Sequence, residues 1–360
     1  MRKFLICFIV FLSQANAREI IHLVRSSRAL LMGDAFTSLS NDDYTLFYNP
    51  GALGENDGIH IYPINLSAAS TNLLKSEDRD RLQEIDKNDV NDIVKSLLDF
   101  PVFIGGGINP GLKLGNFGFN VILNGSARVN VRNATHPTAE IITRYDRGFV
   151  AGYALNFNSG AGVTSIGLSA KYLWRDGQQG FYDLFEVSTY DDISDPDCDE
   201  KCIKETLDYA KGTGIGWDIG LLHVARLDEN SQFRLGLSFL DIGDTTFSTD
   251  GVPTQEMLIN VGVSYIFRDG AFNWTLSADL HPINSKVVFG RQVHVGGEIG
   301  FDIVQVLAGF NGGYFSFGAE FDLKIVKATA GIYDVEVGGG YRDERAKRML
   351  FYIGLLETKF

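Results

Sequence analysis

The residues best placed for covalent chemistry are Cys198 and Cys202, which three residues separate. The only other cysteine, Cys7, lies in the apolar N-terminal stretch. In an exported chain, an even pair at this spacing most simply forms a local disulfide. A zinc site with two thiolates needs further ligands, and the nearby Asp195 and Asp197 are poor soft ligands. We therefore predict a Cys198–Cys202 disulfide and no metal site.

Catalytic motifs are scarce. The sequence has no Gly-x-Ser-x-Gly elbow, no His-Glu-x-x-His pair and no glycine loop for phosphate. Its six histidines are dispersed: His22, His60, His136, His223, His281 and His294. An inward-facing His223 or His294 would suit a barrel enzyme that uses serine and histidine, whereas solvated histidines are the simpler interpretation. We expect no enzymatic activity and no cofactor.

The N-terminus has the pattern of an export signal. Arg2 and Lys3 precede an apolar run over 4–12, and Ala15-Asn16-Ala17 matches a small-x-small cleavage site. The alternative is a membrane anchor, but the run is far shorter than the roughly 20 apolar residues of a spanning helix. We expect residues 1–17 to be a signal peptide cleaved after Ala17. The formal net charge of -13 argues against nucleic-acid binding.

Apolar residues alternate with small or polar residues over long stretches. In 117–131, one face carries mainly Phe, Val and Leu, while the other carries Asn, Ser and Arg. A period of two places successive side chains on opposite faces of a β-strand. The pattern predicts fourteen strands, over 58–70, 102–114, 116–131, 138–156, 163–175, 213–226, 231–243, 256–268, 272–282, 290–300, 303–311, 313–323, 325–333 and 348–360.

Fourteen strands predict a membrane barrel. About eight strands enclose a lumen that side chains just fill, so fourteen enclose one too wide for an apolar core. The apolar face must then contact lipid, and the polar face must line the lumen. Connections after even-numbered strands are short and most others are longer, as in bacterial outer-membrane barrels. The predicted fold is an all-β transmembrane antiparallel barrel with both of its ends in the periplasm.

Two long connections lie on the predicted external side. Residues 76–100 place apolar residues at helical spacing among charges, which predicts one or two amphipathic helices. Their apolar stripe would pack on the rim, cap the mouth or bind a partner. Residues 176–212 form an acidic insertion that contains the cysteine pair.

The most distinctive sequence segment in the chain precedes the first predicted strand. It comprises Arg-Ala-Leu-Leu-Met-Gly-Asp-Ala-Phe-Thr-Ser-Leu-Ser-Asn-Asp-Asp over 28–43 and Leu-Phe-Tyr-Asn-Pro-Gly-Ala-Leu over 46–53. This text resembles the N-terminal segment of the FadL-like outer-membrane proteins, including their PorV-like branch. Members commonly read Asn-Pro-Ala-Gly-Leu where this chain has Ala and Gly exchanged. Gly51 still supplies backbone freedom beside Pro50.

The resemblance implies a division of the chain and a set of site residues. Residues 18–57 would form a lumen plug, and 58–360 the barrel. Its plug motif would be Gly33, Asn49, Pro50 and Gly51. The large side chains that would bind a ligand, or merely fasten the plug to the wall, are Phe36, Leu39, Phe47 and Tyr48.

The resemblance also implies a function. Transporting members pass hydrophobic molecules through a lateral gap in the wall, so we expect passive uptake of hydrophobic small molecules such as fatty acids or hydrocarbons. The alternative is a PorV-like barrel that acts as a scaffold or carrier for secreted or surface proteins. Expected partners are outer-membrane lipid and the barrel-assembly machinery, which commonly recognises a last strand ending in Phe, here Phe360. The expected location is the outer membrane of a Gram-negative bacterium.

Overall fold

The computed structural model describes residues 19–56, 58–86, 90–184, 207–323 and 325–359. Its helices are α1 (Ser27–Leu31), α2 (Thr45–Tyr48), η1 (Pro50–Glu55), α3 (Ser76–Gln83), α4 (Val90–Leu97) and η2 (Phe289–Arg291). Its strands are β1 (Ile59–Tyr62), β2 (Ile64–Thr71), β3 (Val102–Ile108), β4 (Gly111–Leu114), β5 (Phe117–Arg132), β6 (Thr138–Ser159), β7 (Gly162–Asp183), β8 (Ala210–Arg226), β9 (Ser231–Leu240), β10 (Leu258–Asp269), β11 (Phe272–Leu280), β12 (Val293–Phe301), β13 (Val304–Asn311), β14 (Tyr314–Asp322), β15 (Val326–Glu336), β16 (Arg345–Leu355) and β17 (Thr358–Lys359).

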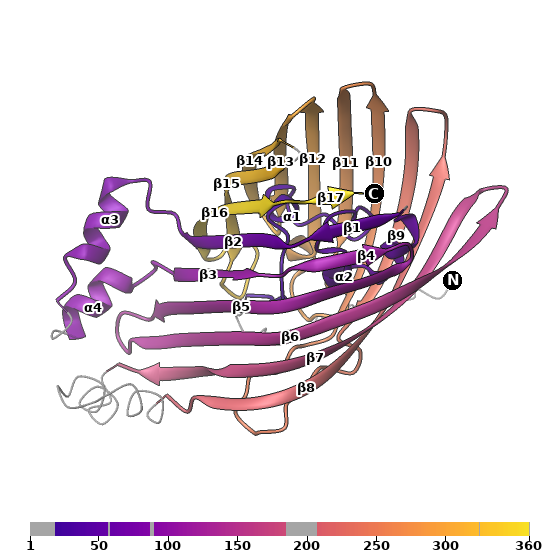
Figure 1. Ribbon diagram of the computed structural model, residues 1–360. Helices are drawn as coiled ribbons and strands as arrows, with labels where there is room; N and C mark the ends of the chain where they lie inside the picture. The colour runs from indigo at the N-terminus through magenta and orange to yellow at the C-terminus, as the bar shows by residue number, and fades with distance from the viewer. Residues whose placement is uncertain (1–18, 57, 87–89, 185–206, 324, 360) are drawn as a thin grey trace, which may run out of the picture.

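The strands form one closed antiparallel barrel (Figure 1). Three wall strands are each interrupted once, giving the pairs β1/β2, β3/β4 and β16/β17, so the 17 segments make fourteen wall strands. The wall closes where β2 pairs with β16 and β1 pairs with β17. The predicted strand number is confirmed, as is the pairing of the last wall strand with the first.

Side-chain exposure alternates along the wall. On β14, Phe315 and Phe317 are 60% and 53% exposed on the outer face, whereas Ser316 between them is fully buried inside. Charged side chains of the wall are buried on the inner face, among them Lys171, Arg234, Asp279, Glu298 and Glu320. An apolar exterior around a polar interior requires lipid outside, because exposure of this much apolar surface to water is unfavourable. The transmembrane interpretation of the period is thereby confirmed.

Connection lengths differ between the two ends of the barrel. At one end, two to four residues join β4 to β5, β6 to β7, β8 to β9, β10 to β11, β12 to β13, and β14 to β15. The connections at the other end are longer, apart from Gly312 and Gly313 between β13 and β14. Short turns mark the periplasmic end and long ones the external end.

Strand β7 extends furthest beyond its predicted end. The expected strand ends at residue 175, but β7 continues to Asp183 and pairs with β6 throughout. This extension reads Asp-Gly-Gln-Gln-Gly-Phe-Tyr-Asp, without apolar alternation. Beyond the lipid both faces of a strand meet water, so the period of two disappears while the backbone pairing persists. The cysteines Cys198 and Cys202 lie outside the described residues, and their disulfide stays a prediction.

Two helices, α3 and α4, form over 76–100 and project beyond the external rim (Figure 1). Of these two, α4 is amphipathic as expected, whereas Leu82 is the one apolar residue of α3. The apolar side of α4 packs on the rim, where Val94 is 7% exposed and Leu98 forms a bridge with Val131 of β5. Arg81 of α3 donates hydrogen bonds to the carbonyls of Ser96 and Leu98. None of the described helices is long and apolar enough to cross a membrane.

Residues 19–56, here called the lumenal segment, lie inside the barrel (Figure 1). Polar wall residues hold this segment. Arg28 makes a bidentate ion pair with Glu298 of β12, at 2.5 and 2.7 Å. The backbone N–H groups of Phe36 and Thr37 donate to one Asp279 oxygen of β11, at 2.8 and 2.7 Å. The space left inside the wide wall is therefore filled by chain rather than by wall side chains.

Candidate ligand cavity and the wall beside it

The Asn-Pro-Gly turn fixes the periplasmic end of the lumenal segment. Asn49 is fully buried and caps η1, since its Oδ1 accepts from the Gly51 N–H at 2.9 Å. Its Nδ2 donates to the carbonyls of Thr37 and Leu221, so one side chain joins two parts of the segment to β8. Pro50 begins η1, where a missing N–H is tolerated.

Glycines allow the close approach between this turn and the wall. Gly167 of β7 and Gly220 of β8 pair with each other directly beneath the turn. A Cβ on Gly220 would lie 2.1 Å from Asn49 Oδ1, and one on Gly51 would lie 2.9 Å from the Gly220 carbonyl. Gly33 has φ +67°, and a Cβ at this residue would lie 2.6 Å from the backbone nitrogen and oxygen of Phe310. In the structure, the four motif residues thus allow the lumenal segment to contact the wall closely.

The four large side chains expected to bind a ligand lie in the core of the lumenal segment. Phe36 and Leu39 are fully buried, and Phe47 and Tyr48 are 7% and 4% exposed. The Phe36 and Tyr48 rings meet edge to face, with centroids 5.2 Å apart. None of these side chains lines either cavity described below. Their contact with a ligand stays a prediction, and their packing matches the fastening alternative.

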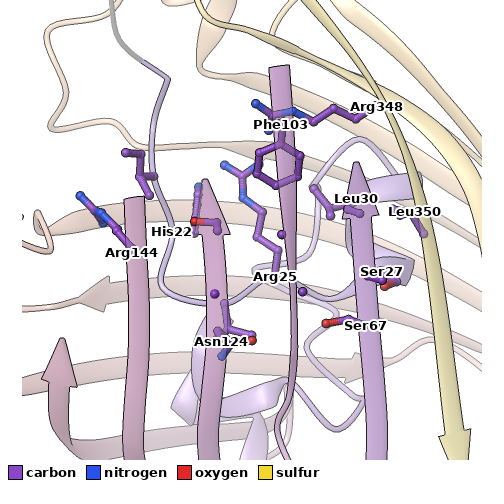
Figure 2. A pocket seen from close by; sticks show the side chains of 18 of the residues that line it. His22, Arg25, Ser27, Leu30, Ser67, Phe103, Asn124, Arg144, Arg348 and Leu350 are labelled. Atoms are coloured by element: carbon purple, nitrogen blue, oxygen red, sulfur yellow. The ribbon is translucent and has the colours of Figure 1, made fainter. Parts of the chain in front are cut away.

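A cavity of about 120 Å³ lies between the lumenal segment and the wall (Figure 2). The lumenal segment contributes Val24, Arg25, Ser27 and Leu30 to its lining. The wall contributes small residues of β2, β3 and β5 together with larger side chains, which are Phe103, Asn124, Arg128, Arg144, Asp146, Tyr333, Arg348 and Leu350. Apolar and cationic groups therefore face the same space, so the cavity suits an amphipathic molecule.

Four arginines surround the cavity, namely Arg25, Arg128, Arg144 and Arg348. Glu19 forms ion pairs with two of them, at 3.2 Å to Arg128 and 2.7 Å to Arg348. Burial alone raises the pKa of Glu19, but these two guanidinium groups hold it well below its usual value. The second acid in the lining, Asp146, is paired with Arg175. Cationic charge exceeds anionic charge at this cavity.

Several guanidinium donors are buried without a hydrogen-bond partner among the described residues. They are Arg128 Nη1, Arg144 Nε and Arg348 Nε. A buried donor without a partner costs about 1–3 kcal/mol, and more when it is charged. An anionic group in the cavity would remove that cost. The Phe103 ring lies 3.9 Å from the guanidinium carbon of Arg348, which places an apolar surface directly beside the cations.

The wall beside the cavity is thin. Ala68 of β2, Gly106 of β3 and Gly125 of β5 lie side by side on its outer face. Ala69, Gly105 and Ser126 lie side by side on the inner face. We call these six residues the small-residue window. At the window, only backbone and small groups separate the cavity from lipid.

The three interrupted wall strands lie next to the window. Pro63 separates β1 from β2, and Asn109 with Pro110 separates β3 from β4. The pairing shifts by one residue between Tyr62 opposite Gly111 and Leu66 opposite Ile108, which marks a β-bulge. Proline cannot donate to a ladder, which accounts for the interruptions at Pro63 and Pro110. Between β16 and β17 the break falls at Leu356 and Glu357, where Leu356 has a positive φ of 58°.

Polar side chains connect this interruption to the lumenal segment. Asn65 Nδ2 donates to Asp43 at 2.6 Å and to the Asn109 carbonyl at 2.7 Å. Asn120 Nδ2 donates to the Asp43 carbonyl, and the Tyr352 hydroxyl donates to the Asp43 carboxylate. Asp43 is therefore bound to the first and last wall strands together, at the seam of the barrel.

The sequence interpretation missed the cavity. The Gly105-Gly106-Gly107 run is visible in the sequence, and glycine within a strand pattern signals close approach or a bulge. The arginines gave no such signal, because they come from the lumenal segment, β5, β6 and β16 and meet only in the fold.

A closed antiparallel wall, an apolar outer face and a filled polar lumen together define an outer-membrane β-barrel. No family model matches the sequence. No curated protein matches it either. Solved structures of similar shape include the CymD monoaromatic hydrocarbon channel, with a TM-score of 0.49 and 10% identity over 96% of this chain and 99% of that one. The toluene transporter TbuX of Ralstonia pickettii gives 0.46 and 9% over 93% and 99%, and TodX of P. putida gives 0.46 and 11% over 94% and 99%. At these values, each likeness is one of overall shape.

Proposed function

We propose that this barrel is a passive uptake channel for hydrophobic small molecules that carry one carboxylate, such as fatty acids. The observation that carries the proposal is the arginine-lined cavity behind the small-residue window. No energy coupling or cofactor is needed, because the molecule moves down its own gradient. The structures named above are a monoaromatic hydrocarbon channel and two toluene transporters.

The cavity accounts for both ends of such a molecule. The carboxylate takes up the buried donors of Arg128, Arg144 and Arg348, since charge-assisted hydrogen bonds are the strong ones. The alkyl part contacts Phe103, Leu30 and Leu350, which line the same space. Hydrocarbons without a carboxylate gain only the second set of contacts and bind less tightly.

The small-residue window is the proposed route from cavity to membrane. A hydrophobic molecule that leaves sideways enters lipid directly and avoids the periplasmic water. At the window itself, mainly backbone hydrogen bonds hold β2 to β3, because small side chains there interlock little. Side-chain hydrogen bonds join the two strands on either side of it, between Thr71 and Phe103 and between Asn65 and Asn109. The neighbouring bulge at Pro63 already shortens the regular ladder on one side.

Cross-linking the window tests this route. We propose the pair Ala69→Cys and Gly105→Cys, which lie opposite each other on β2 and β3. A Gram-negative host without its own fatty-acid channel would express the barrel, and uptake of radiolabelled dodecanoate would be measured. Oxidation should reduce uptake at least tenfold, and a reductant should restore it.

The matched control joins Val263→Cys to Ala278→Cys, an opposite pair on β10 and β11 far from the window. Oxidation of this pair should leave uptake unchanged. Equal uptake by the oxidised and reduced window variants would exclude the lateral route. Equal uptake by cells with and without the barrel would exclude transport itself.

The other parts of the proposal concern biogenesis and partners. We propose that residues 1–17 are removed after Ala17, that 18–57 act as the plug and 58–360 as the barrel, and that the assembly machinery recognises the last strand. The scaffold alternative depends on α3 and α4. Within the described part of the 76–100 connection, α4 packs on its own rim and leaves the charged surface of α3 exposed, and we favour transport.

A further inference from the structure

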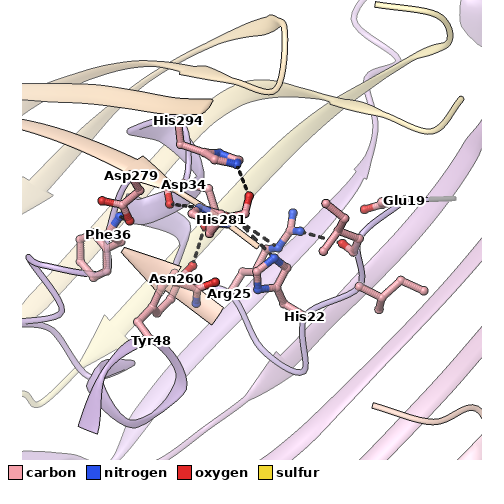
Figure 3. Close-up of polar contacts among 12 residues, drawn as sticks. Glu19, His22, Arg25, Asp34, Phe36, Tyr48, Asn260, Asp279, His281 and His294 are labelled. Atoms are coloured by element: carbon pink, nitrogen blue, oxygen red, sulfur yellow. Dashed lines mark hydrogen bonds and ion pairs between the residues drawn. The ribbon is translucent and has the colours of Figure 1, made fainter. Parts of the chain in front are cut away.

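Three side chains that can bind a metal meet between the lumenal segment and the wall. His22 and Asp34 belong to the lumenal segment, and His281 follows β11 (Figure 3). One ligand atom from each residue lies within 4.8 Å of the other two. The Asp34 and His281 side chains are buried, at 1% and 3% exposure, and the His22 side chain is 8% exposed.

One ring nitrogen of His281 makes no hydrogen bond to any of the described residues. Its Nε2 lies 2.9 Å from the Asp34 carbonyl oxygen and must donate to it. The neutral ring then carries its lone pair on Nδ1, which is buried and has no hydrogen-bond partner in the described part of the chain. A buried acceptor without a donor is unfavourable, and a cation would satisfy it.

A neighbouring histidine does not compete for the same role. His294 stacks on His281, with ring centroids 3.6 Å apart. Its two ring nitrogens face the carbonyl oxygens of Gly33 and His281, at 2.9 and 3.1 Å. Stacking on His294 and the hydrogen bond from Nε2 to the Asp34 carbonyl fix the orientation of the His281 ring. Backbone carbonyls commonly hold metal-binding histidines in this way.

There is also space for an ion. A cavity of about 30 Å³, which is room enough for a water or an ion, has His22, Asp34, His281 and His294 in its lining. Two imidazoles, one carboxylate and a water form a common tetrahedral set for zinc, with metal–ligand distances of about 2.0–2.2 Å. The ligand atoms must then approach by about 1 Å. His22 can move, because 19–26 has no regular secondary structure.

We infer that His22, Asp34 and His281 form a binding site for a divalent transition metal of the zinc class. The ion would link His22 and Asp34 of the lumenal segment to His281 of the wall. In the structure, Arg25 Nε lies 3.6 Å from Asp34 Oδ2 and supplies the compensating positive charge. The metal replaces this contact, and Arg25 keeps its hydrogen bond to the Ile20 carbonyl.

Cobalt provides the test, because tetrahedral Co²⁺ absorbs strongly in the visible range. The tag-free barrel would be stripped with a chelator in detergent and titrated with Co²⁺. A Cys198→Ser, Cys202→Ser background removes competing thiols. We expect one equivalent of Co²⁺ with a tetrahedral spectrum, displaced by one equivalent of Zn²⁺.

Two variants identify the ligands. His22→Gln and Asp34→Asn should each weaken Co²⁺ binding at least tenfold, and Asn is well suited to the positive φ of 63° at residue 34. His136→Gln removes an exposed histidine and should change nothing. Heat-modifiable gel mobility verifies that every variant is folded. Absence of stoichiometric Co²⁺ uptake, or uptake equally strong in both ligand variants, would overturn the assignment.

Discussion

At the scale of single residues, the uneven charge of the cavity decides which ligands it accepts. Arg144 donates to Gln255 and to the Thr254 carbonyl but has no carboxylate partner among the described contacts. Arg144→Met should therefore weaken dodecanoate binding by about 10- to 100-fold, the equivalent of a charged hydrogen bond of about 1.5–3 kcal/mol. Binding of dodecanol should change less than threefold. Isothermal titration calorimetry on the purified barrel measures the binding of both ligands.

Arg268→Met is the matched control, since Arg268 is exposed at the periplasmic end of β10. An equal loss of dodecanol and dodecanoate binding in Arg144→Met would show that the cavity had collapsed rather than lost a charge.

Asp43 should make stability depend on pH. Burial, and then the neighbouring Asp42 carboxylate, raise the pKa of Asp43 from 3.8 to about 7. Between these two values the folded protein binds more protons than the unfolded chain, so stability present below about pH 4 is lost as pH rises through 7. Asp43→Asn keeps an acceptor for Asn65 and Tyr352 without the charge. Its thermal midpoint should fall less between pH 4 and pH 8 than that of the wild type.

At the scale of elements, the contact between η1 and the wall depends on missing side chains. Gly220→Ala would drive a Cβ into Asn49 Oδ1 and detach the turn from β8. Overpacking of this kind costs about 1–3 kcal/mol. We expect a lower thermal midpoint and faster proteolysis within residues 45–56. Gly160→Ala in the β6–β7 turn meets no atom within 4 Å and should leave both measurements unchanged.

The elements also show why some features were predictable and others were not. The strands follow from a period that lipid and lumen impose on every membrane-facing residue, so the ranges from 102–114 to 313–323 closely match observed strands. The period does not predict the external part of β7, residues 176–183, or the interruptions at Pro63 and Pro110. Water on both faces imposes no period, and a one-residue bulge depends on the partner strand, which local sequence does not specify.

At the scale of the whole molecule, lipid is the solvent that the outer face requires. Leu276 lies at the middle of β11 and is 57% exposed on this face. Leu276→Arg should cost about 2–4 kcal/mol of folding free energy in a bilayer, because a charge near the midplane is poorly solvated. Leu227→Arg, at an equally exposed residue in the β8–β9 turn, should cost at most about 1 kcal/mol. Equilibrium folding into lipid vesicles would compare the two, and equal costs would contradict this placement of the membrane.

The bonds of Asp43 to Asn65 and Tyr352 constrain the order in which the molecule can be built. These partners belong to the first and last wall strands, which meet only when the barrel shuts. A closed wall would offer a threaded segment no way to reach buried positions behind so many wall contacts. The lumenal segment must therefore be in place before the seam forms. The wall strands then assemble around the lumenal segment. This segment precedes all of the wall strands in the chain, so it is available before they pair.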